Sequence, residues 1–111
     1  MALYFLTDQP NNLLSSFKKA IDAGHVVTWS YDKDGDFIHT AQQWKNLAWL
    51  RPSTASGRLV LNILKPNNAN ISWEVYGIYH GRFIESMTIH CHSLFTNAQA
   101  TASPTPADVV G

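Results

Sequence analysis

The sequence predicts an α+β fold in which two main helices pack on one face of a mostly antiparallel sheet of about five to six strands. Three observations support this class. Short segments rich in aromatic and β-branched residues alternate with two longer segments of helical periodicity. One Asp-Gly pair between two strand-like segments is typical of an antiparallel hairpin. The chain has 111 residues, 45% of them hydrophobic, which is enough to bury the core of one domain.

The first third of the chain reads as a strand followed by a helix. Residues 2–7 (ALYFLT) form the strand, and Asn11 or Asn12 is expected to cap the helix. Apolar residues then recur at helical spacing over residues 13–21. Gly24 is the expected end of this helix, because glycine readily adopts the left-handed conformation found at helix C-termini.

The middle of the chain reads as a hairpin and a short helix. Residues 25–31 (HVVTWSY) and 36–39 are expected to pair through the Asp-Gly turn between them. Thr40 and Gln43 match a capping box, which predicts a short helix that ends near residue 47.

Two further strands follow. Residues 47–51 form the first, which Pro52 is expected to end. Residues 58–64 (RLVLNIL) form the second, after a polar turn at 53–57. Apolar residues occupy both the odd and the even positions of this segment, so we expect a central strand that is covered in part on both faces.

The last third reads as a long helix, a strand and a tail. Residues 71–95 have the longest helical pattern, and residues 97–102 alternate alanine with polar residues as a strand does. The predicted order is therefore β-α-β-β-(short α)-β-β-α-β. We expect one compact domain over residues 1–103. Residues 104–111 are expected to be a flexible tail, because they contain two prolines and little to bury.

Composition limits the compartment and the partner. The chain has one cysteine, Cys91, which fits a reducing compartment, and its first residues do not resemble a signal peptide. No apolar run approaches the roughly 18 residues of a membrane span, so no membrane partner is expected. We therefore predict a cytoplasmic protein.

The charges are unevenly distributed although they sum to zero. Residues 1–36 carry three lysines and five aspartates, a net charge of −2. Residues 45–82 carry five basic residues and one glutamate, a net charge of +4. The basic middle can attract an acidic partner. The neutral total argues against a dedicated nucleic-acid-binding protein.

The long helix contains the stretch that most resembles a site. Arg82 and Glu85 are three residues apart and can form a surface ion pair. Arg82 could instead bind a carboxylate or phosphate together with Tyr79 and His80. Gly81 in mid-helix is explained either by close packing on another element or by access for a partner.

Two patterns that resemble metal sites are interpreted without a metal. His90 and His92 flank Cys91, but residues two apart on a helix point about 200° apart and cannot share one ion. Cys91 falls on the predicted core face. In the DKDGD segment the glycine is fourth, whereas an EF-hand needs it sixth, and Gln43 stands at the twelfth position, where an EF-hand needs glutamate. The tight turn is therefore the better interpretation. We predict no metal and no cofactor.

An aromatic and basic cluster surrounds the predicted short helix. Trp44, Trp49 and Arg51 lie there with Lys45, and these residue types are frequent both in interfaces and in cores. If Trp49, Arg51 and Arg58 are exposed on a sheet face, they could instead bind nucleic acid, although no RNP-like pattern is present.

These observations favour a small, non-enzymatic, intracellular protein that binds another macromolecule. A protein partner is preferred, an immunity- or antitoxin-like inhibitor is one version, and a homodimer is a further option. The alternative from another class is a small hydrolase or nuclease that uses His80, Arg82 and Glu85, although no spacing identifies catalytic residues. A nucleic-acid-binding module is the third hypothesis.

Overall fold

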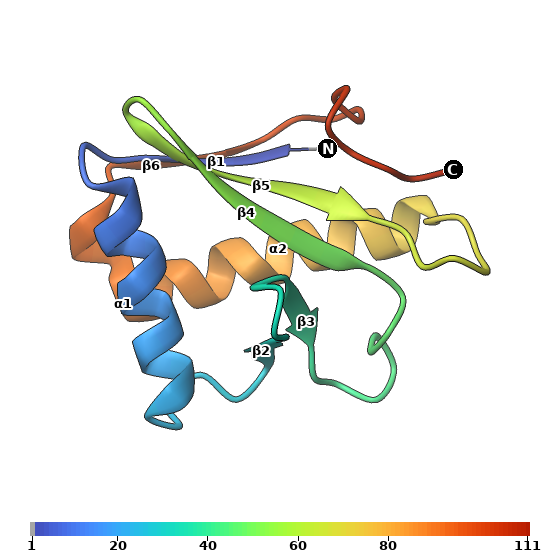
Figure 1. Ribbon diagram of the computed structural model, residues 1–111, viewed down its shortest axis with the longest axis horizontal. Coiled ribbons are helices and arrows are strands. Elements are labelled where there is room, and N and C mark those ends of the chain that lie inside the picture. Colours follow the sequence, from blue (N-terminus) through green and yellow to red (C-terminus); the bar gives the residue numbers. More distant parts are fainter. Residues whose placement is uncertain (1) are drawn as a thin grey trace.

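The computed structural model describes residues 2–111. Six strands form one antiparallel sheet in the order β2-β3-β4-β5-β1-β6. Both helices lie on the same side of this sheet (Figure 1), so the predicted α+β class is confirmed. In chain order the elements are β1 (Ala2–Leu6), α1 (Pro10–Asp22), β2 (Trp29–Tyr31), β3 (Phe37–His39), β4 (Trp49–Ala55), β5 (Arg58–Leu64), α2 (Trp73–Cys91), a 3-10 turn (His92–Leu94) and β6 (Asn97–Ala100).

β5 is a central strand, as its sequence predicts. It pairs with β4 on one side and β1 on the other. Leu59, Leu61 and Ile63 are fully buried against the helices, whereas Val60 and Leu64 are only partly buried. Successive side chains of a strand point to opposite faces, so the odd positions form the core and the even positions face away from the helices.

The core is centred on Phe83 of α2. Its ring lies 5.1 Å from the rings of Phe17 and Phe37 and 6.0 Å from Phe5, measured between centroids. These rings come from α1, β3 and β1, so one side chain joins both helices to the sheet. All four phenylalanines are fully buried.

The helix ends are partly as predicted. Gly24 has a φ of +80° just after α1, which confirms it as the end of that helix. The predicted caps Asn11 and Asn12 are wrong, since α1 begins at Pro10. Proline is well suited to the first helical position, because its φ is already helical and it has no N–H to leave unpaired. At α2 the Ser72 side chain accepts a hydrogen bond from the Val75 N–H.

The predicted helix over residues 40–47 is wrong. Thr40 does not cap, because its hydroxyl donates to the Val27 carbonyl at 2.6 Å. The N–H groups of Trp44 and Lys45 both donate to the Ala41 carbonyl, which makes one helical turn. Asn46 then has a φ of 63°, which ends the turn.

Strand boundaries differ from the prediction at Pro52. β4 does not stop there but continues to Ala55. β3 pairs with β4 at Leu50 only, so Pro52 lies where β4 is an edge strand and its missing N–H leaves no neighbour unpaired. The hairpin between β2 and β3 is confirmed, with Gly35 at a φ of +86° in its turn.

Residues 104–111, which the sequence predicts to be a flexible tail, lie against the sheet. The Val109 N–H donates to the Ile63 carbonyl at 2.9 Å, and the Lys65 N–H donates to the Val109 carbonyl at 2.7 Å. The segment therefore has a defined position beside β5, and its flexibility stays a prediction.

Candidate functional site

The face of the sheet opposite the helices carries no helix in the part of the chain that the structure describes (Figure 1). Strand register determines which side chains share it, because directly paired residues point to the same side. Tyr4 pairs with Val60, Trp49 with Leu64, and Arg51 with Asn62. This outer face is built by Tyr4, Leu6, Trp49, Arg51, Arg58, Val60, Asn62 and Leu64.

The outer face carries four partly exposed apolar or aromatic side chains. Tyr4, Trp49, Val60 and Leu64 are each partly exposed rather than buried. Their strand neighbours that point inward are fully buried, and residues 104–111 lie beside Asn62 and Leu64 at one end of the outer face. Aromatic side chains are enriched at protein interfaces, so such a face is a candidate binding surface.

A cation lies over one of these aromatic rings. The Arg58 guanidinium is 4.4 Å from the centroid of the Tyr4 ring, within cation–π range. Arg58 forms no ion pair with any residue from 2 to 111. Its charge is therefore positioned by the ring and not compensated by a carboxylate.

The second arginine of the face is compensated. Arg51 donates through Nε and Nη2 to the two carboxylate oxygens of Asp36, at 3.0 and 2.8 Å. The Asp36 side chain is 7% exposed and the Arg51 side chain 58%. Hydrogen bonding to Asp36 raises the pKa of Arg51. Such a bidentate pair fixes the guanidinium against the sheet and leaves its outer edge open.

Two of the predicted binding residues meet in a structural contact. Tyr79 is fully buried, and its hydroxyl donates to the Trp44 carbonyl. Burial raises the pKa of this hydroxyl. Tyr79 therefore attaches the turns at residues 41–47 to α2, and it is not available to a ligand.

The structure separates His80 and Arg82. His80 is 2% exposed and its Nδ1 donates to the Tyr76 carbonyl, whereas Arg82 is exposed. Because His80 and Arg82 are two residues apart on a helix, their side chains point about 200° apart. Glu85 is exposed and forms no ion pair with Arg82. The geometry does not assemble these three residues into a reaction centre.

Gly81 is not explained by packing within the chain. A Cβ built at this position meets no atom within 4 Å, apart from the local backbone of its own helix, so the close-packing interpretation is wrong. The same holds for Gly77, one turn earlier.

The last residue of β3 is a buried histidine, His39, which no sequence motif singles out. The His39 ring lies 4.8 Å from the Trp29 ring between centroids, tilted by 59°, and its Nδ1 accepts the Ala41 N–H at 3.1 Å. Burial and, second, the charge of Arg82 lower the pKa of His39. Its Nε2 and the Trp29 Nε1 have no hydrogen-bond partner in the described chain. Because Nδ1 accepts a hydrogen bond, the proton of the neutral His39 ring lies on Nε2.

The HCH segment has no metal-site geometry. Cys91 is 4% exposed and belongs to the core, while His90 and His92 are exposed. Burial raises the pKa of the Cys91 thiol. Across residues 2–111 no group of three histidine, cysteine, aspartate or glutamate residues is arranged to hold a metal ion. Nor does any helix in that range have the length and apolarity to span a membrane.

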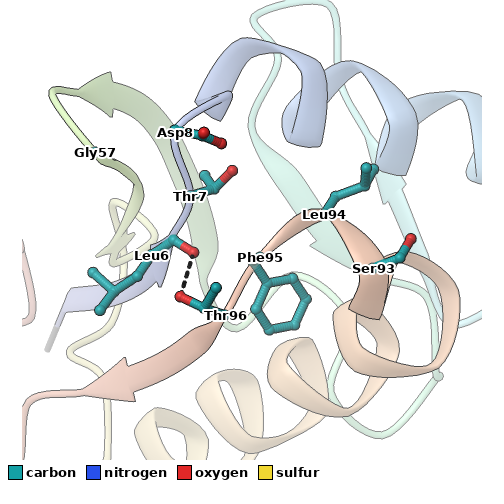
Figure 2. A pocket seen from close by; sticks show the side chains of 8 residues that line it. All are labelled: Leu6, Thr7, Asp8, Gly57, Ser93, Leu94, Phe95 and Thr96. Atoms are coloured by element: carbon teal, nitrogen blue, oxygen red, sulfur yellow. Dashed lines mark hydrogen bonds between the residues drawn. The ribbon is translucent and has the colours of Figure 1, made fainter.

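A hollow of about 420 Å³ lies where β1, the β4–β5 turn and the segment before β6 meet (Figure 2). None of the predicted site residues lines it. Its polar groups are largely used within the chain: the Thr7 hydroxyl accepts the Gln9 N–H, and the Leu6 carbonyl accepts from Thr96. Asp8 lies just before α1, where a carboxylate is favourable to the helix dipole. The hollow thus has no set of convergent free polar groups.

Comparisons with known proteins give no relative. No protein-family model matches the chain, and neither a curated protein nor a solved structure is significantly similar to it.

Proposed function

We propose that this chain is a non-enzymatic binding protein and that another protein docks on its outer face. The observation that carries the proposal is the helix-free sheet face with Tyr4, Trp49, Val60 and Leu64 partly exposed beside two arginines. Tyrosine, tryptophan and arginine are the residue types that contribute most binding energy at protein interfaces.

The anchors of this face are positioned before a partner arrives. Arg58 lies over Tyr4 and Arg51 is held by Asp36, so little side-chain freedom remains to be lost on binding. Arg58 has no carboxylate partner in residues 2–111, which favours a partner surface that offers an acidic group at this point.

Nucleic acid is the second candidate, because Trp49, Arg51 and Arg58 share the open face. Two observations favour a protein instead. Base stacking needs a free ring face, and Arg58 covers one face of Tyr4. Phosphate binding needs uncompensated cations, and Asp36 already neutralises Arg51.

The test is quantitative affinity capture with matched variants. Tagged wild type, Trp49→Ala and Trp73→Ala chains are purified from the cells that make the protein, with and without nuclease, and the captured proteins are measured by mass spectrometry. Trp73 is 70% exposed on α2, so its loss removes an exposed tryptophan from another surface. We expect a stoichiometric protein that survives nuclease, is retained by Trp73→Ala and is lost with Trp49→Ala.

Other outcomes identify other functions. A partner set that disappears with nuclease assigns the face to nucleic acid, and binding to single-stranded RNA should then weaken steeply with salt. A partner retained by both variants moves the interface away from the outer face. An inhibitor of the immunity or antitoxin kind would return a toxin-like enzyme as its partner.

A further inference from the structure

The end of β5 pairs with the C-terminal segment of the chain. Among the described residues, β1 pairs with β5 as far as Ala2, opposite Asn62, and β5 continues to Leu64. The segment around Val109 lies beside these last residues of β5 and forms a parallel bridge with Leu64. On its other side, the Val110 carbonyl accepts the Ile71 N–H at 2.8 Å. Residues 108–110 thus fill a slot between residues 62–65 and Ile71.

Asp108 attaches this segment to the slot. Its Oδ1 accepts the Ile63 N–H and the Asn62 side-chain amide, both at 3.0 Å. Its Oδ2 accepts the Thr105 N–H at 2.7 Å and the Thr105 hydroxyl at 3.0 Å. One carboxylate therefore closes the turn of the segment and joins that turn to β5.

Polar and main-chain contacts dominate this attachment. The Val109 side chain is 46% exposed, and Val110 is only partly buried at the border of the core. The connection to β6 runs through Ala102 and Ser103, both exposed. A segment with few buried apolar contacts can open locally without unfolding the domain.

We propose that this slot is a strand-addition site for a partner protein and that residues 104–111, here named the strap, are its built-in competitor. The occupant that it fits is an extended segment with a carboxylate followed by two β-branched apolar residues. Asp108, Val109 and Val110 show this chemistry in place: the carboxylate meets the Ile63 N–H and the Asn62 amide, and the next two residues pair with the main chain. Strand addition of this kind takes affinity from main-chain hydrogen bonds and specificity from side chains. The slot shares Asn62 and Leu64 with the outer face, but docking on that face is tested at Trp49, which has no bond to the strap, so the two proposals can fail independently.

The test frees the slot in the full chain. Asp108→Ala removes the strap's carboxylate and leaves Ile63 and Asn62 available. A synthetic peptide that copies residues 105–111 is titrated into the ¹⁵N-labelled variant, and the amide signals of Lys65 and Ile71 are followed. We expect saturable shifts at both amides. The wild-type chain should bind at least about tenfold more weakly, because its own strap occupies the slot.

Two controls make the result decisive. A peptide with Asp108→Asn should bind about tenfold more weakly to the variant, since the charge-assisted hydrogen bonds are lost. Asp34→Ala, in the exposed hairpin turn, should leave peptide binding as weak as in wild type. The proposal is wrong if the Asp108→Ala chain is folded and its Lys65 and Ile71 amide signals do not shift when the peptide is added.

If Asp108→Ala does not fold, the wild-type chain supplies the test. Excess peptide at millimolar concentration should accelerate hydrogen exchange at the chain's own Val109 amide, which the Ile63 carbonyl otherwise protects. Unchanged exchange at Val109 means that the strap is a fixed part of the fold, and the proposal is then wrong.

Discussion

The two faces of the sheet use the same strands in opposite ways. On the inner face, aromatic rings from four elements surround Phe83 at 5.1–6.0 Å between centroids and are fully or almost fully buried. On the outer face, Tyr4 and Trp49 are partly exposed, and arginines rather than other rings accompany them. The inner face is the source of stability. The outer face carries no helix, and its apolar side chains are only partly buried.

The largest effect is expected at the centre of the inner face. Phe83→Ala should lower the free energy of unfolding by about 3–5 kcal/mol, because it removes contacts to both helices and the sheet and leaves a cavity. Urea denaturation monitored by tryptophan fluorescence measures this loss. Trp73→Ala, on the exposed side of the same helix, should stay within about 0.5 kcal/mol of wild type. Similar losses in the two variants would contradict a core centred on Phe83.

Two neighbours on β5 sharpen the comparison. Leu61 points inward and is fully buried, whereas Val60 points outward and is partly exposed. Leu61→Ala should destabilise by about 2–5 kcal/mol and Val60→Ala by less than about 1 kcal/mol. Denaturation of both variants under the same conditions decides this. A Val60 loss as large as that of Leu61 would mean that the outer face is also packed.

The arginines of the outer face should differ from each other. Arg51→Met leaves the Asp36 carboxylate, only 7% exposed, without its partner, and we expect a loss of about 1–2 kcal/mol. Arg58→Met leaves no carboxylate without its partner, so it should destabilise the protein less than Arg51→Met. Thermal denaturation of both variants at low and high salt tests this order. Equal losses would show that the Asp36 pair contributes nothing particular.

The smallest effect concerns pH on the inner face. Burial, with the nearby Arg82 charge, holds the pKa of His39 below its ordinary value of 6.5. The unfolded chain therefore binds a proton more readily than the folded one, and stability should fall as pH decreases below 6.5. His39→Asn keeps an acceptor for the Ala41 N–H and should flatten this part of the pH profile. A profile that is unchanged in the variant would assign the dependence to another group.

The structure also explains which predictions succeeded. β5 was predicted with its observed bounds, because its apolar run depends only on a strand being central. The helix over residues 40–47 failed, because the Thr40 hydroxyl bonds to Val27, a residue on a different segment. The prediction that Pro52 ends its strand failed for a similar reason. A proline is accepted within β4 because β3 does not pair with β4 at that point.

The candidate site, too, was predictable from the sequence only in part. Trp49 and Arg51 were selected from the sequence because of their residue types, but their common face with Tyr4 depends on the pairing of β4, β5 and β1. Tyr4 was missed, although the alternation in ALYFLT separates it from its apolar neighbours. The separation of His80 from Arg82 was available from helical geometry, whereas the burial of His80 was not.

By itself the sequence determined the α+β class, the Asp-Gly hairpin, the central strand and the long helix, because these depend on local propensity and on the periodicity of apolar residues. Tertiary structure alone decided which side of the sheet carries no helix, that Asp36 compensates Arg51, and that Asp108 attaches residues 104–111 to β5. The physical reason is the same in each case. These features depend on hydrogen bonds and strand pairings between segments far apart in the chain. No local sequence pattern specifies which distant group a given side chain or strand will pair with.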